Sequence, residues 1–519
     1  MSSPTRALQA AGGLALEPGS IVEALSAEFA VVTHSKRLVR LSRLDTFDRR
    51  LQEAGLTLEH QVVASGHRLV LGRTDGSSTV AVPAEDLRWP ALAEALPPGL
   101  IGDAVAPVIG VRALMVVSGE RRRRQLLDLR NGDGKTVARV ELDESASAGD
   151  ESARLRVQTM RGYDEQARQA EDLLVGLGLR PVQGGAAGEV GEKGRAGSAR
   201  KAGSAGKGSG ELRHEPAGLL LATALSDFLL AMRENLPGLL DDVDTEFLHD
   251  FRVAVRRTRS TLKLGRPALP EVMRERWEPA FKWLGDMTTP VRDLDVYELE
   301  LPTMSRWLVK ADPADLDPLA THLRRRRTSA RQALVRTLRS ARFKRLVTDW
   351  EQELARLRDA PDLPQDPDRE HLSAVELAER SISRAHRRVA RGGAAIEADS
   401  PAEDLHSLRK RCKELRYALE VFAPVVDKRA RKRVVNDLKE VQDSLGRFQD
   451  SEVQRRALRE LAEEMMAAGT TAGALLAMGE LIGHLDVEQD RARVEFHETF
   501  ARLERPTSLQ VMERLGVRR

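Results

Sequence analysis

The chain has 519 residues, long enough for two or three domains, and its 82 Lys and Arg nearly balance its 79 Asp and Glu, for a formal charge of +3. The single cysteine, Cys412, excludes an intrachain disulfide, a multi-cysteine zinc site and an iron–sulfur cluster, and we expect it to pack as a small apolar residue. Aromatic residues make up only 4% of the chain, which disfavours a surface that stacks nucleic-acid bases.

The first part of the chain predicts a β domain at residues 21–182, after a flexible N-terminus at 1–20. Short segments rich in β-branched and apolar residues alternate with turn signals, and Asn131-Gly132-Asp133-Gly134 is a strong hairpin signal. An antiparallel sheet with a few helices fits this pattern. The expected strands are 29–33, 38–41, 56–63, 69–71, 79–82, 126–129 and 137–142, and the expected helices are 48–54, 85–95 and 163–176.

A flexible linker is predicted at residues 183–212. Residues 183–210 consist of Gly, Ala, Ser, Lys, Arg and Glu with few exceptions, including ten glycines and no leucine or aromatic residue. A segment of this composition behaves as a flexible connection between domains. Its excess of basic residues leaves two interpretations open, solubility or weak contact with a polyanion.

After the linker, long amphipathic segments predict an all-α domain at 213–510, with a C-terminal tail at 511–519. A helical His-x-x-Arg pattern occurs at His249 and again at His406, and the offset of 157 residues (406 − 249) holds further along the chain. Constant register between two long segments indicates a duplicated helical bundle with a pseudo-twofold axis. The repeats are expected at about 213–360 and 370–510.

Each copy of the pattern presents a row of cations. On a helix His249, Arg252, Arg256, Arg259 and Lys263 of the first copy fall within a sector of roughly 80°, beside an apolar sector that packs against the domain, and Arg257 and Lys410 extend the rows. Arg suits a phosphate ligand because its planar fork donates two hydrogen bonds, so we expect the rows to bind a polyanion. The first row is His249, Arg252, Arg256, Arg257, Arg259 and Lys263, and the second is His406, Arg409, Lys410, Lys413 and Arg416.

The two histidines and the acids downstream of them have more than one interpretation. His249 and His406 could donate to an anion, could be buried against a carboxylate such as Asp293 or Asp450, or could ligate a metal. Asp293 and Asp450 are also 157 residues apart. This symmetric placement favours carboxylates that hold the cationic rows in position over a metal or acid/base pair.

A third basic element runs from residue 323 to 345, and no acidic residue occurs between Pro318 and Thr348. A solvated helix face is one interpretation of such a run. Ligand contact is favoured here because a solvated helix normally mixes charges of both signs to form i,i+4 pairs. The candidate binding residues of this element are Arg324, Arg327 and Arg331. The shorter run at 428–433 has the same two interpretations.

The duplicated pattern resembles the conserved-histidine α-helical domain family, CHAD, over about residues 214–510. The resemblance is carried by the segments 248–259, 291–296, 405–417 and 445–450. It implies an all-helical, internally duplicated domain whose basic surface binds inorganic polyphosphate.

The first part of the chain resembles, more weakly, a divergent CYTH domain, an antiparallel β tunnel of the triphosphate-binding type. The matching segments are 44–51, 54–58 and 125–144. The Glu-x-Glu-x-Lys strand of that family is missing, since Glu28 is followed by Ala30 and Val32. Glu141 and Asp143 would share one face of a strand, where they could bind a metal or form a solvated face.

We therefore expect a noncatalytic polyphosphate-binding protein with a degenerate CYTH-like domain and no cofactor. The alternatives are a CYTH-type triphosphatase or polyphosphatase that uses Mg²⁺ or Mn²⁺, and a nucleic-acid-binding protein, which the scarcity of aromatic residues disfavours. The sequence has no run of about 18 apolar residues and no signal-peptide pattern, so we expect a cytoplasmic protein without a membrane partner, associated with polyphosphate granules.

Overall fold

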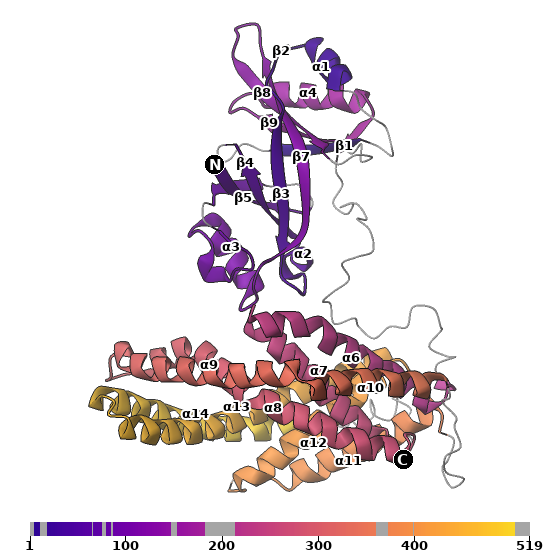
Figure 1. Cartoon of the computed structure of the whole chain (residues 1–519), viewed down its shortest axis with the longest axis vertical. Coiled ribbons are helices and arrows are strands. Elements are labelled where there is room, and N and C mark those ends of the chain that lie inside the picture. Colours follow the sequence, from indigo (N-terminus) through magenta and orange to yellow (C-terminus); the bar gives the residue numbers. More distant parts are fainter. Residues whose placement is uncertain are drawn as a thin grey trace. The chain divides into compact units, whose positions relative to one another are not determined.

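A computed structural model gives the chain two compact units, residues 1–199 with 241–246, and residues 200–240 with 247–519 (Figure 1). The predicted linker at 183–212 and the predicted tail at 511–519 lie outside the described residues. The structure describes residues 5–10, 18–64, 66–74, 79–84, 87–146, 153–181, 213–359, 372–397 and 399–503.

The described strands of the first unit form one antiparallel ten-stranded sheet. Along the sheet the order is β10-β1-β9-β8-β7-β3-β4-β5-β6, and β2 pairs separately with β7. The strands are β1 Thr5–Ala10, β2 Ala30–Thr33, β3 Arg37–Asp45, β4 Leu56–Val63, β5 Gly66–Arg73, β6 Thr79–Pro83, β7 Met115–Arg130, β8 Thr136–Ser145, β9 Ala153–Thr159 and β10 Leu179–Pro181.

The two faces of this sheet differ in polarity. Helices α1 (Pro18–Ser26) and α4 (Asp164–Gly176) pack on the apolar face at β7, β8 and β9, and α2 (Arg50–Glu53) and α3 (Leu100–Ile109) pack on it at β3, β4 and β5. The opposite face carries charged residues. On that face Arg156 of β9 lies 4.0 Å from Glu59 of β4, although three strands separate β9 from β4 in the sheet order. The sheet is therefore curled, with its polar face inside.

Several expectations for the first unit need correction. Residues 5–10, expected within a flexible N-terminus, form β1 and pair with β9 and β10. The prediction of a helix at 85–95 is wrong for the described residues of this range, where only a 3₁₀ turn, η1 (Ala93–Ala95), forms. Pro90 lacks an N–H donor and disfavours helix in the residue before it, and Ala91 instead bridges to Leu114. Strand β9 and helix α3 were not expected.

The second unit is all-helical, as predicted. In the described part of the chain, no helix is long and apolar enough to span a membrane. Sequence signals set some of the helix starts. Ser373 and Glu376 form a capping box at α11, and the Asp427 carboxylate accepts from the N–H of Ala430 at α13. The helices are α6 Ala217–Asp241, α7 Thr245–Leu264, α8 Glu271–Met304, α9 Asp317–Arg339, α10 Ala341–Asp359, α11 Ala374–Ala394, α12 Ala402–Val421, α13 Lys428–Ala467 and α14 Ala472–Leu503, with short 3₁₀ turns η2 Ser305–Trp307 and η3 Pro313–Leu316.

The predicted duplication is visible in where the helices begin. The starts of α6 and α11 are 157 residues apart (374 − 217), and the same offset relates α7 to α12 (402 − 245) and α8 to α13 (428 − 271). Each repeat therefore places its cationic row on its second helix, between two helices that also correspond. Cys412, on the packed side of α12, is fully buried, and burial raises the pKa of its thiol to about 12, as expected for a packing residue.

Candidate functional site

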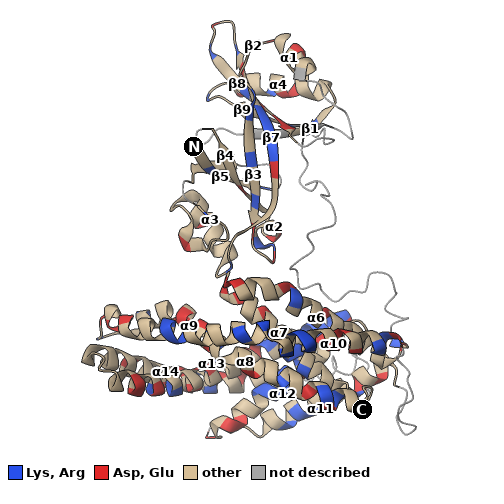
Figure 2. Cartoon of the chain, viewed as in Figure 1, with Lys and Arg blue, Asp and Glu red and all other residues tan. Residues whose placement is uncertain are grey.

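The two cationic rows lie on α7 and α12, where Figure 2 shows Lys and Arg in blue. Each row flanks a buried apolar stripe. On α7 the stripe includes Phe251, Val255 and Leu262, and on α12 it includes Leu408 and Leu415. Since an α-helix turns by about 100° per residue, fixing these stripes against the core also fixes the direction of the neighbouring polar sector. We call the two rows together the cationic surface.

The charges of the two rows act on each other at equivalent residues. Arg256 of α7 and Lys413 of α12 are 157 positions apart, and each charge lies within the electrostatic reach of the other. Desolvation, followed by the charges of Arg409 and Arg256, lowers the pKa of the Lys413 ammonium to about 8, although Asp450 opposes the shift. Positive charge is therefore concentrated where the repeats come together, and a bound anion would relieve it.

Several cations of this surface have no acidic partner in the described structure. No carboxylate of a described residue lies within ion-pair distance of them, and three of them are exposed to solvent. Positive charge that is left unneutralised on one surface raises the local concentration of anions. These residues are Arg256, Arg259, Lys263, Lys410 and Lys413, of which Arg256, Lys263 and Lys410 are the exposed ones.

Arg252 and Arg409, which correspond in the two repeats, are held by the helix that follows each row. Arg252 Nη1 donates to the Gly285 carbonyl at 3.2 Å and to the Thr288 and Thr289 hydroxyls at 2.8 and 2.9 Å. Arg409 Nη1 donates to Asp450 Oδ1 at 3.2 Å. Their guanidinium groups are thereby fixed in orientation at the base of the rows.

The symmetric carboxylates differ in how closely they contact the rows. Asp450 pairs directly with Arg409, whereas Asp293 acts on Arg252 through its charge. Desolvation raises the pKa of Asp293, and the charges of Arg252 and Arg292 oppose that shift. In both repeats the acid thus lies beside the Arg that it was predicted to support.

The histidines begin the rows but take different surroundings. His406 Nδ1 lies 2.6 Å from Gln449 Oε1 and donates to it, so its partner is an amide and not a carboxylate. Desolvation, together with the charges of Lys410 and Arg409, lowers the pKa of His406. His249 is half-buried near the start of α7. Among the residues that the structure describes, no group of three or more His, Cys, Asp and Glu is placed to hold a metal ion.

In the third basic element, on α9, two of the three candidate residues are engaged within the protein. Arg327 Nε donates to the buried Asp295 at 2.6 Å and lies 3.6 Å from Glu298, both on α8. Arg331 donates to the Leu240 carbonyl at 2.8 Å, and Arg324 is exposed. Acids of α8, about 30 residues away in the chain, thus pair with Arg327, which looked unpaired in its own segment.

A residue that the sequence interpretation missed is Glu420, in the last turn of α12. Its Oε2 lies 3.0 Å from Arg257 Nη2 of α7, and its Oε1 lies 3.6 Å from Arg416 Nε. It therefore links the rows of the two repeats. The sequence held a signal for it, because Glu420 stands where the 157-residue offset places Lys263 in the first repeat (420 − 157).

The charged inner face of the curled sheet is neutralised by its own residues. Arg124 of β7 donates to both oxygens of Asp143 on β8, at 2.6 and 2.7 Å, and lies 3.7 Å from Glu141. Desolvation lowers the pKa of Arg124, but Asp143 and Glu141 bring it above its ordinary value. Asp143 is thus engaged by Arg124 through both oxygens, and Glu141 lies beside the same guanidinium.

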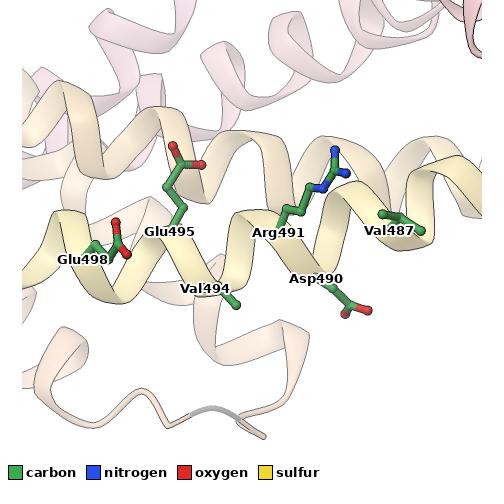
Figure 3. Close-up of a pocket in the computed structure, with 6 residues that line it drawn as sticks. All are labelled: Val487, Asp490, Arg491, Val494, Glu495 and Glu498. Carbon is green, nitrogen blue, oxygen red and sulfur yellow. The ribbon is translucent and has the colours of Figure 1, made fainter.

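A surface pocket on α14 does not extend the cationic surface. Its lining residues lie along one side of the helix (Figure 3) and include three acids and one arginine. Such a lining repels a polyanion. The residues are Val487, Asp490, Arg491, Val494, Glu495 and Glu498.

Comparison with known proteins identifies the family of the domain in the helical unit. Residues 223–459 match the family model of the CHAD domain. The helical unit contains a CHAD domain. The matched region spans both cationic rows, from α6 into α13, and agrees with the resemblance in the sequence. No curated protein matches the chain.

Solved structures similar to this chain include the CHAD domain from the plant Ricinus communis, which is 25% identical and covers 55% of this chain and 93% of its own, with a TM-score of 0.45. PptA from Streptomyces chartreusis is 20% identical and covers 55% of this chain and all of its own (100%), with a TM-score of 0.44. A candidate adenylyl cyclase from Hippeastrum, described as having a dominant triphosphatase activity, is 16% identical and covers 36% of this chain and 92% of its own, with a TM-score of 0.25. The predicted order of an antiparallel β unit before a duplicated all-α unit is confirmed.

Proposed function

We propose that this chain binds inorganic polyphosphate on the cationic surface of its CHAD domain and does not catalyse a reaction on it. The observation that carries the proposal is that the rows of the two repeats are joined, since Glu420 contacts Arg257 of α7 and Arg416 of α12, while Arg256 and Lys413 have no acid among the described residues in ion-pair distance. Placing like charges together costs free energy in the absence of a ligand. That cost is recovered when a polyanion binds.

The dimensions and chemistry of the surface fit a linear phosphate polymer. Helices α7 and α12 each have 20 residues, and the rows at 249–263 and 406–416 run along about 21 and about 15 Å of them. Polyphosphate carries a negative charge on every repeat unit and has no base edges to be read, so spaced cations are sufficient to bind it. Arg supplies paired donors and Lys supplies point charges, and both kinds occur in each row.

The absence of catalysis is proposed from the chemistry of both units. The two rows consist of Arg, Lys and His, and their acids are paired with arginines or lie beside them, as with Asp450 and Glu420. In the first unit Asp143, one of the two carboxylates that could hold a metal, binds Arg124 through both oxygens. A phosphate-release assay on tripolyphosphate with Mg²⁺ or Mn²⁺ tests this part, and metal-dependent turnover that is lost in Glu141→Gln would overturn it.

Charge reversal at the meeting point tests the binding site. The double variant Arg256→Glu, Lys413→Glu should lose at least a hundredfold in affinity for long-chain polyphosphate, because two attractive contacts become repulsive. The matched control is Arg306→Glu, Lys310→Glu, which makes the same charge change at two exposed residues at and after η2. Helical circular dichroism should be the same for all three proteins. Equal losses in both variants would mean that net charge alone governs binding.

Salt and competition distinguish polyphosphate from nucleic acid. Affinity should fall steeply as salt rises from about 50 to 200 mM, because binding releases counterions from the polyanion. Duplex DNA should compete for the surface only weakly, because few aromatic side chains are available to stack bases and the rows provide only phosphate contacts. If DNA displaced polyphosphate at equal phosphate concentration, the surface would be a general polyanion site.

A further inference from the structure

A carboxylate lies inside the cationic surface and contacts both of its rows. Glu420 is half-buried, and its two oxygens face Arg257 of the first repeat at 3.0 Å and Arg416 of the second at 3.6 Å. Elsewhere the acids that support the rows come from the following helices, as Asp450 does from α13. Glu420 belongs to α12 itself, the helix that carries the second cationic row.

The contacts around Glu420 satisfy charge but leave hydrogen-bonding capacity unused. Arg257 Nε, Arg416 Nε and Glu420 Oε2 are buried atoms with no hydrogen-bond partner in the described structure. A phosphate group offers several acceptor oxygens in place of the single pair of a carboxylate, so it could accept from Nε and Nη donors together. These two arginines are therefore better suited to phosphate than to Glu420.

The internal repeat shows that Glu420 departs from the symmetry of the domain. The equivalent residue of the first repeat is Lys263, an exposed cation with no described carboxylate in ion-pair distance. Arg257 also has an acidic counterpart, Glu414 (257 + 157), but Glu414 pairs with Arg388 of α11 at 2.7 Å and leaves the rows unaffected. Of Glu420 and Glu414, therefore, only Glu420 neutralises cations of the surface.

We propose that Glu420 is a built-in competitor of the polyanion. It occupies Arg257 and Arg416 while no ligand is bound, and a bound phosphate displaces it from them. Glu420 thereby sets the affinity of the surface below what its cations alone would give. A polymer that gains contacts along both rows tolerates this loss, whereas a single phosphate does not, so the residue favours long polyanions. The inference rests on the proposed function, because it concerns the same surface.

Removal of the charge tests the inference. Glu420→Gln should bind long-chain polyphosphate about tenfold more tightly than the wild-type chain at low salt, because two arginines are freed for the ligand. A plot of log affinity against log salt should become steeper by roughly one to two units, since each added phosphate contact releases counterions. Binding is measured on the full chain by fluorescence anisotropy with labelled polyphosphate of uniform length.

The control and a second variant make the result decisive. Glu403→Gln makes the same charge change in the first turn of α12, at an exposed acid with no described ion pair, and should change affinity by less than about twofold. Glu420→Asp keeps the charge but withdraws it from both arginines, so it should give a smaller gain in the same direction. It also replaces Glu420→Gln if that variant does not fold.

The outcomes separate this inference from the proposed function. A wild-type chain that fails to bind polyphosphate contradicts the proposed function, and Glu420 then has no ligand to compete with. A wild-type chain that binds, with no gain or a loss in affinity in both Glu420 variants, overturns the inference alone. In that case Glu420 would be a positioning residue that holds Arg257 and Arg416 for the ligand. Equal gains in Glu420→Gln and Glu403→Gln would also overturn it, because net charge would then explain both.

Discussion

The inner face of the curled sheet and the cationic surface of the helical unit are both rich in arginine, yet they differ in what surrounds each guanidinium. In the sheet, Arg124 binds both oxygens of Asp143, and Arg156 reaches Glu59 across the curl. On the helices, Arg256 and Arg259 have no carboxylate of a described residue within ion-pair distance. The number of cations therefore says little about ligand binding, and the acids on neighbouring elements decide it.

The difference follows from the two kinds of secondary structure. Neighbouring strands place side chains of the same face about 5 Å apart, so an acid on β8 is within reach of an arginine on β7. On a helix, residues three or four positions apart are neighbours, and the first row has cations at almost all of these positions. A sheet thus neutralises its own arginines across strands, while a helical row remains positive unless another helix supplies the acid.

The largest effect is expected from breaking the pair inside the sheet. Arg124→Leu should destabilise the first unit by about 3–5 kcal/mol, because Asp143 would be left buried without its counterion. Chemical denaturation followed by a probe in the first unit measures this. Arg154→Leu is the matched control, since its pair with Glu120 is largely exposed and should contribute less than about 1 kcal/mol.

The double variant Arg124→Leu, Asp143→Leu sharpens the same test. Replacing both partners by apolar residues removes the unpaired charge, so most of the lost stability should return. If Arg124→Leu lowered the free energy of unfolding no more than Arg154→Leu does, water must reach Asp143 in the curled sheet. The inner face would then be open to small anions, and the contrast between the two regions would weaken.

A smaller effect separates the two kinds of arginine within the helical unit. Arg327→Gln should lower stability by roughly 2–3 kcal/mol, because it removes the charged donor that lies 2.6 Å from the buried Asp295, and should change polyphosphate affinity by less than about twofold. Arg259→Gln should do the reverse, weakening binding several-fold with little change in stability. Thermal unfolding and anisotropy on both variants measure the two effects. A large affinity loss in Arg327→Gln would return α9 to the binding surface.

The sequence was sufficient for the duplication and the rows because both depend on local periodicity. The offset between His249 and His406 predicted the equivalence of α7 and α12, and the helix starts reproduce it. The strand β4, expected at 56–63, is observed as Leu56–Val63, since its composition and flanking turns are local signals too.

What the sequence could not give is the set of partners that come from distant elements. Asp295 and Arg327 are 32 residues apart, and Asp143 and Arg124 are paired across two strands. Glu420 meets Arg257 only because two repeats pack together. Strand β1 was missed because it pairs with β9, about 150 residues later, and pairing at that distance leaves no local pattern. Contacts between repeats and between strands decide which cations remain available.

The pH dependence of binding gives the most specific effect. The pKa of Lys413 is lowered to about 8 by desolvation and by Arg409 and Arg256, and a bound polyanion would raise it towards its ordinary value of 10.5. Below pH 8 the ammonium is already charged in the free protein. Above pH 8 binding must take up a proton, so affinity should fall between pH 8 and about 10, by at most tenfold per pH unit.

Arginine substitution identifies Lys413 as the source of this dependence. Lys413→Arg keeps the charge throughout the range, because a guanidinium stays protonated, so affinity should become nearly constant between pH 8 and 10. Lys410→Arg makes the same exchange at an exposed residue of the same row and should leave the pH dependence of the wild-type chain in place. Affinities measured across this range at fixed ionic strength compare the three proteins. If the profile stayed unchanged in Lys413→Arg, the polyanion would not contact the meeting point of the two rows, and the cations that remain unpaired there would serve another purpose.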